Sequence, residues 1–80
     1  MRIFYFEGKK NISGRRICEA RKNEGLTQKD LAAKLQVAGV NLERDSISRI
    51  EKGERIVTDF ELLIFADLLG VSPLWLLGLK

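Results

Sequence analysis

Hydrophobic side chains recur every three to four residues along most of the chain, and this spacing predicts helices. In residues 27–35, Leu31, Ala32 and Leu35 share one face, as in an amphipathic helix. Residues 59–69 are apolar over most of their circumference, which predicts a central core helix whose excess apolar surface a partner covers. The predicted helices cover residues 13–23, 27–35, 44–51 and 59–69, followed by a short helix that opens at Pro73 and stops at Gly78.

The helix predicted over residues 44–51 has two different sides. Ile47 and Ile50 face inward, at helical spacing. Its other side is polar and carries Arg44, Asp45, Ser48 and Arg49. A short helix held down by two isoleucines, with polar side chains turned outward, suits insertion into the major groove of DNA.

Capping residues mark where the helices begin. Ser13 is a good N-cap for the first helix. Thr27 followed three residues later by Asp30 predicts a cap for the second, and Thr58 followed by Glu61 predicts one for the fourth.

The first ten residues contain a β-prone run that includes Phe4, Tyr5 and Phe6. This run can fold back on the helical body or pair with the same segment of a second chain; the alternative is a disordered start. The sequence therefore predicts a short extended N-terminal arm or strand at 1–10, a candidate dimer contact, and a helical domain at 11–80.

Composition narrows the class of protein. Eighty residues make one domain, no apolar run approaches the length of a membrane span, and the N-terminus lacks a signal-peptide plan. The single cysteine, Cys18, allows no internal disulfide and agrees with a cytoplasmic location.

The net charge of +3 is unevenly spread. Residues 1–29 carry +5, residues 30–56 balance, and residues 57–80 carry −2. The basic first third fits a surface that attracts phosphate groups. The alternative interpretation is that these lysines and arginines are simply solvated.

Nothing in the sequence indicates catalysis, a metal site or a cofactor. There are no histidines, and Cys18 lacks a partner for a zinc cluster or a thiol–base pair. Neither of the glycine-rich nucleotide-binding motifs occurs. We expect a protein that is not an enzyme.

Several short motifs occur together in one order. They are Leu26-Thr27-Gln28, Leu31-Ala32, Ile47-Ser48-Arg49-Ile50-Glu51-Lys52-Gly53, Leu68-Leu69-Gly70-Val71-Ser72 and Trp75-Leu76-Leu77. With them, residues 17–78 resemble the Cro/phage-repressor, or XRE-type, helix-turn-helix family. The resemblance implies an all-α, compact five-helix, lambda-repressor-like domain that binds operator DNA, usually as a dimer.

The resemblance also implies roles for individual side chains. By position, the residues that would reach base edges are Arg44, Asp45 and Arg49, with Ser48 between them, and those that would contact phosphates are Thr27, Gln28, Lys52 and Arg55. Each has an ordinary alternative: Asp45 can favour a helix N-terminus or pair with Arg49, and the arginines can serve solubility.

The connection at 36–43 departs from the family pattern because it is longer than usual. Val37, Val40 and Leu42 make it apolar, so we expect it to pack on the domain edge, with a tight turn at Gly39. Two polar residues of this connection could join the DNA-facing rim, namely Asn41 and Glu43.

The sequence therefore predicts a transcriptional regulator that binds double-stranded operator DNA, and it favours a repressor acting by occupancy as a homodimer. The dimer would form through Phe4, Tyr5 and Phe6, through the last two helices, or through both. The alternative is a protein-interaction module, antitoxin-like or a regulatory partner, that uses the same apolar surfaces.

Overall fold

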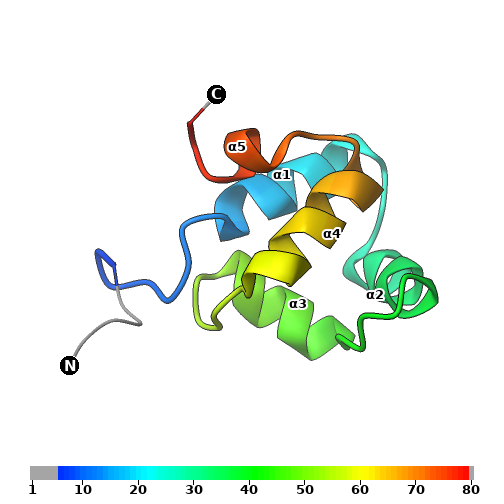
Figure 1. The fold of residues 1–80 in the computed structure, drawn as a ribbon. Helices are drawn as coiled ribbons and strands as arrows, with labels where there is room; N and C mark the ends of the chain where they lie inside the picture. The colour runs from blue at the N-terminus through cyan, green and yellow to red at the C-terminus, as the bar shows by residue number, and fades with distance from the viewer. Residues whose placement is uncertain (1–5, 80) are drawn as a thin grey trace.

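The computed structural model describes residues 6–79, and Phe4 and Tyr5 lie outside this range. The described chain folds into helices in the predicted order, which confirms the all-α class (Figure 1). They are α1 (Gly14–Asn23), α2 (Gln28–Val37), α3 (Arg44–Glu51), α4 (Asp59–Leu69) and α5 (Pro73–Leu76). None of the helices within residues 6–79 is long and apolar enough to cross a membrane.

Reciprocal hydrogen bonds fix the starts of α2 and α4, as predicted. The Thr27 hydroxyl accepts from the N–H of Asp30 at 3.0 Å, and the Asp30 carboxylate accepts from the N–H of Thr27 at 2.9 Å. Thr58 and Glu61 make the same pair of bonds at 3.3 and 3.0 Å. Each pair satisfies two N–H groups that have no partner inside the helix.

The start of α1 differs from the prediction. Ser13 precedes the helix, but its side chain makes no capping hydrogen bond. Its backbone is already helical (φ −94°, ψ −13°), whereas a capping residue is normally extended. The side chain of Asn11 replaces it, and its Oδ1 accepts from the N–H of Gly14 at 2.7 Å.

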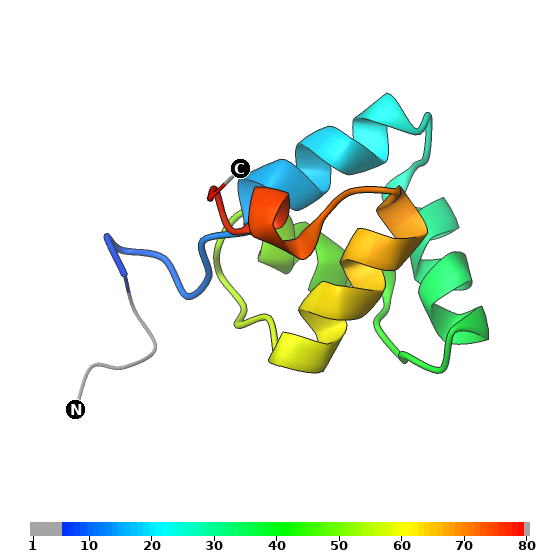
Figure 2. The same cartoon turned by 45° about the horizontal axis from the view of Figure 1, so that its top comes forward.

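The core receives side chains from every helix in the described range. Its largest fully buried members are Ile17, Leu31, Leu35, Ile47, Ile50, Phe65, Leu69 and Leu76. α4 lies across the front of the molecule with α3 below it (Figure 1), and the turned view shows α5 against the start of α1 (Figure 2). Burying a side chain of this size contributes about 1.5–3 kcal/mol.

The connection between α2 and α3 packs largely as predicted. Gly39 takes a positive φ of 90°, and Val40 and Leu42 are buried. Val37 is an exception, because its side chain is 91% exposed. α2 continues through Val37, and this last residue lies on the side of the helix opposite Leu35.

α4 leaves part of its apolar surface uncovered in the single chain. Phe60 and Leu63, one turn apart, are 61% and 58% exposed, and we call them the apolar face of α4. The opposite side of the same helix is buried through Phe65 and Leu69.

Candidate nucleic-acid interface

The two sides of α3 are separated as the hydrophobic pattern predicts. Ile47 and Ile50 are fully buried. The outer side carries Arg44, Asp45 and Arg49, all exposed, and the half-buried Ser48; we call these four residues the polar face of α3. The core contacts of the isoleucines therefore hold the polar face toward solvent.

The charged side chains of this polar face have no partners within residues 6–79. No hydrogen bond or ion pair in that range engages the side chain of Arg44, Asp45 or Arg49, so the alternative pairing of Asp45 with Arg49 is not formed. An exposed guanidinium with all its N–H groups available can bind a planar pair of acceptors in two-point fashion.

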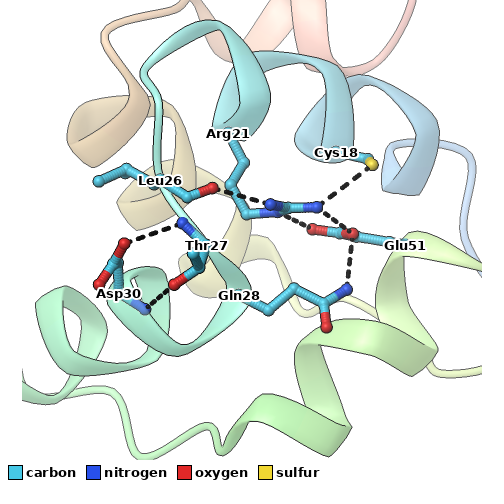
Figure 3. A network of polar contacts seen from close by, with 7 residues as sticks. All are labelled: Cys18, Arg21, Leu26, Thr27, Gln28, Asp30 and Glu51. Atoms are coloured by element: carbon cyan, nitrogen blue, oxygen red, sulfur yellow. Dashed lines mark hydrogen bonds and ion pairs between the residues drawn. The ribbon is translucent and has the colours of Figure 1, made fainter.

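The C-terminal end of α3 is held by a buried ion pair that the sequence patterns did not predict. The Arg21 Nε donates to Glu51 Oε2 at 2.7 Å and Nη2 donates to Oε1 at 3.1 Å, with side chains 10% and 6% exposed (Figure 3). Arg21 Nη1 also donates to the carbonyl oxygen of Leu26 at 2.8 Å. One feature of the sequence could have indicated this pair. Arg21 follows Ile17 by four residues and therefore lies on the buried side of α1, where a charged side chain needs a partner.

The ion pair determines the protonation of its members. Burial alone would raise the pKa of Glu51, but hydrogen bonds from Arg21 and Gln28 outweigh this effect, so the pKa lies below its usual value. The hydrogen bond to Glu51 raises the pKa of Arg21 in turn. Both groups are therefore charged at neutral pH.

Gln28, a predicted phosphate contact, is bound to the same carboxylate. Its Nε2 donates one N–H to Glu51 Oε1 at 2.9 Å and keeps a second N–H (Figure 3). Gln28 begins α2, whose first N–H groups have no acceptor within the helix apart from the cap at Thr27.

Arg44 lies close to the start of α2. It lines one surface hollow together with Thr27 and Gln28, the two predicted phosphate contacts of that helix. Lys22 and Lys29, which the sequence analysis did not assign, line the same hollow. The fold thus brings the first residue of the polar face of α3 beside a helix N-terminus and two further cations.

The two phosphate contacts predicted after α3 have different surroundings. Lys52 is exposed and follows Ser48 by four residues, so it continues the polar face of α3. Arg55 instead donates to Glu61 Oε1 at 3.2 Å and to the carbonyl oxygen of Ile56 at 2.8 Å. These bonds turn the guanidinium toward α4, and the phosphate role of Arg55 stays a prediction.

The remaining candidate residues lie outside α3 and the start of α2. Asn41 and Glu43, the predicted rim residues, are exposed in the connection before α3. Cys18 is half-buried, and its Sγ accepts from Arg21 Nη2 at 3.6 Å. No group of three acidic, cysteine or histidine side chains in the described part of the chain is arranged to hold a metal ion.

Comparison with known families accounts for most of the chain. Residues 17–76, from the buried Ile17 of α1 to the buried Leu76 of α5, match the helix-turn-helix family. No curated protein and no solved structure matched the chain. The matched family consists of DNA-binding domains rather than enzymes. With the order of its five helices and the exposed polar face of α3, this chain belongs to the XRE-type helix-turn-helix family of DNA-binding regulators.

Proposed function

We propose that this protein is a sequence-specific transcriptional regulator that reads double-stranded DNA with the polar face of α3. One observation carries the proposal. Arg44, Asp45 and Arg49 are exposed, and their side chains have no partner among residues 6–79, on a helix whose opposite side is fixed in the core by Ile47 and Ile50. A helix anchored in this way can enter a major groove without unfolding any part of the domain.

Each side chain of the polar face has a chemistry that fits base edges. Arg44 and Arg49 would each bind guanine O6 and N7 with two hydrogen bonds. Asp45 would accept a hydrogen bond from cytosine N4, and the Ser48 hydroxyl can donate or accept. In this proposal the two arginines supply most of the discrimination between sequences.

Phosphate contacts would fix the domain on the duplex. The Gln28 amide retains a free N–H, and the Thr27 N-cap lies beside the first N–H groups of α2, which favour an anion. Lys52 would bind the backbone at the other end of α3, and Arg55 would join it only by leaving Glu61. Contacts of this kind provide affinity without sequence information.

We further propose that the protein represses by occupying its operator as a homodimer. The apolar face of α4 supports a dimer because Phe60 and Leu63 are neighbouring exposed apolar side chains on one helix, which a second copy of the chain would cover. The predicted arm at 1–10 could add to it through Phe6, which is 61% exposed. Two α3 helices would then enter major grooves about 10 bp apart.

The apolar face of α4 also supports a second candidate, a protein-interaction module such as an antitoxin-like partner. The two candidate functions differ in whether the protein selects a DNA sequence. A DNA reader enriches a defined sequence from duplexes of random sequence at moderate salt, whereas an interaction module enriches none. This selection tests the proposed function, and failure to enrich any sequence over several rounds would contradict it.

A further inference from the structure

The first described residues form a tight turn. The N–H of Phe6 donates to the carbonyl oxygen of Lys9 at 2.6 Å, and the N–H of Lys9 donates to that of Phe6 at 3.0 Å. Between them, Glu7 and Gly8 both have positive φ, 52° and 79°. Two consecutive residues with positive φ are typical of a type I′ hairpin turn, which has a defined backbone geometry.

The segment that follows this turn is bound to the end of α3 and the loop after it. The N–H of Lys10 donates to the carbonyl oxygen of Gly53 at 2.8 Å. The Asn11 amide donates to the carbonyl oxygens of Ile50 and Arg55 at 3.0 and 2.7 Å. Figures 1 and 2 both show the segment running beside the loop between α3 and α4. The N-terminal segment is therefore a neighbour of the proposed DNA-reading helix.

The side chain of Lys9 is placed by the same contact. Its aliphatic stem lies over Gly53, where an added Cβ would collide with the Lys9 Cδ. Its Nζ donates to the carbonyl oxygen of Lys52 at 3.2 Å. An ammonium group has three N–H donors, so two remain for an external acceptor. Only glycine at position 53 allows the stem of Lys9 to lie so close to the backbone.

Positive charge gathers where Lys9 meets α3. Lys9, Arg15 and Lys52 line one surface hollow that begins at the C-terminal end of the helix. Glu7 and Glu51 also line it, but the Glu51 carboxylate is already neutralised within the network of Figure 3. The hollow lies at the C-terminal end of α3, the negative end of the helix dipole, so the three cations and not the helix itself would attract a phosphate group.

We propose that Lys9 is a DNA-backbone contact, and that Lys9, Lys52 and Arg15 form a phosphate-binding cluster at the C-terminal end of α3. This inference rests on the proposed function and extends it, because it gives the predicted arm a role in DNA binding in addition to any role in a dimer. The cluster lies at the opposite end of α3 from Arg44, whereas Gln28 reaches the same end through its bond to Glu51. Lys9, Lys52 and Arg15 would thus add phosphate contacts near the one proposed for Gln28.

The test compares Lys9→Ala with Lys34→Ala, using the complete chain and a selected duplex. Lys34 is an exposed lysine of α2 whose side chain makes no hydrogen bond or ion pair within the described residues, so it controls for the loss of one charge. Affinity is measured by fluorescence anisotropy across a series of salt concentrations. Circular dichroism melting confirms that each variant is folded.

We expect Lys9→Ala to reduce the slope of log affinity against log salt concentration by about 0.9. This corresponds to a loss of affinity of roughly eightfold at about 0.1 M salt. The loss should be equal on the selected and on unrelated duplexes, because phosphate contacts carry no sequence information. We expect Lys34→Ala to bind like the wild type. If Lys9→Ala also shows wild-type affinity and salt dependence, Lys9 is not a backbone contact, and the proposed function still stands. A wild-type chain that binds no duplex at all would overturn both.

Discussion

Arg21 and Glu51 join α1 to the end of α3, with Nε and Oε2 separated by 2.7 Å. The same guanidinium holds the carbonyl oxygen of Leu26, just before α2, and the same carboxylate accepts from Gln28. One buried pair therefore sets α1, α2 and α3 relative to one another. Because Gln28 and α3 both face the proposed DNA site, this pair also positions the two groups that would bind phosphate and bases.

Arg21→Ala should lower the free energy of unfolding by about 3–5 kcal/mol, because it leaves the Glu51 carboxylate buried without its partner. Urea denaturation monitored by circular dichroism measures the effect. Arg15→Ala, at an exposed position of the same helix, should change stability by no more than about 0.5 kcal/mol. Equal stability of the two variants would show that the pair does not hold the helices together.

Stability should fall as the pH drops below the usual range of a glutamate. Burial opposes the ionised forms of Glu51 and Glu61, but hydrogen bonds from Arg21 and Gln28, and from Thr58 and Arg55, lower both pKa values in the folded protein. The unfolded chain therefore binds more protons than the folded chain in acid. The stabilisation is fully present above the unfolded pKa of about 4.3 and is lost as the pH falls through the lower folded values.

Thermal melts between neutral pH and pH 3 measure this dependence. The melting temperature should be nearly level above about pH 5 and should decline below it. Glu51→Gln removes one of the carboxyl groups whose pKa is lowered by folding, so its curve should be flatter in acid although its neutral stability is lower. A wild-type curve without an acid decline would contradict the assigned pKa directions.

Gly14→Ala should destabilise the protein although alanine is the better helix former by about 1 kcal/mol. α1 begins so close to the end of α3 that a Cβ at Gly14 would collide with the carbonyl oxygen of Ile50. Forcing the two helices apart should cost about 1–3 kcal/mol. Chemical denaturation is again the measurement, and a stabilised Gly14→Ala variant would show that the helices are not in such close contact.

The proposed dimer is tested by sedimentation of the wild type and of two variants. We expect a dimer at tens of micromolar protein, and we expect Phe60→Ser with Leu63→Ser to shift it to a monomer, because both exposed side chains would leave the interface. Val37→Ser removes a similarly exposed apolar side chain from α2 and should leave the dimer intact. A monomeric wild type at this concentration would rule out the dimer.

Sequence patterns predicted the features that depend on neighbouring residues. The paired caps at Thr27 and Thr58 and the buried position of Ile47 follow from spacings of a few residues, and the structure confirms them. The capping role assigned to Ser13 was wrong, because Asn11 is held in place by carbonyl groups far along the chain and caps α1 instead. Local spacing contains no information on such contacts.

The same limit applies to the candidate site. The polar face of α3 follows from helical periodicity alone, so the exposed positions of Arg44 and Arg49 could be predicted, while their role in DNA binding stays a prediction. The partners of Glu51 and the position of Lys9 beside Lys52 depend on how distant segments pack, so neither could be predicted from local spacing. Arg55 was assigned by its place after α3, but its ion pair with Glu61 becomes visible only in the folded chain.

Readout of bases by α3 is tested by the affinity of Arg44→Ala and Arg49→Ala for a selected duplex, measured by gel shift at one moderate salt concentration. We expect each variant to lose about 1–3 kcal/mol of discrimination between the selected and an unrelated duplex. We also expect the bases tolerated at one or two positions to become less restricted. If both variants bind the selected duplex as tightly and as selectively as the wild type, α3 does not read the DNA sequence.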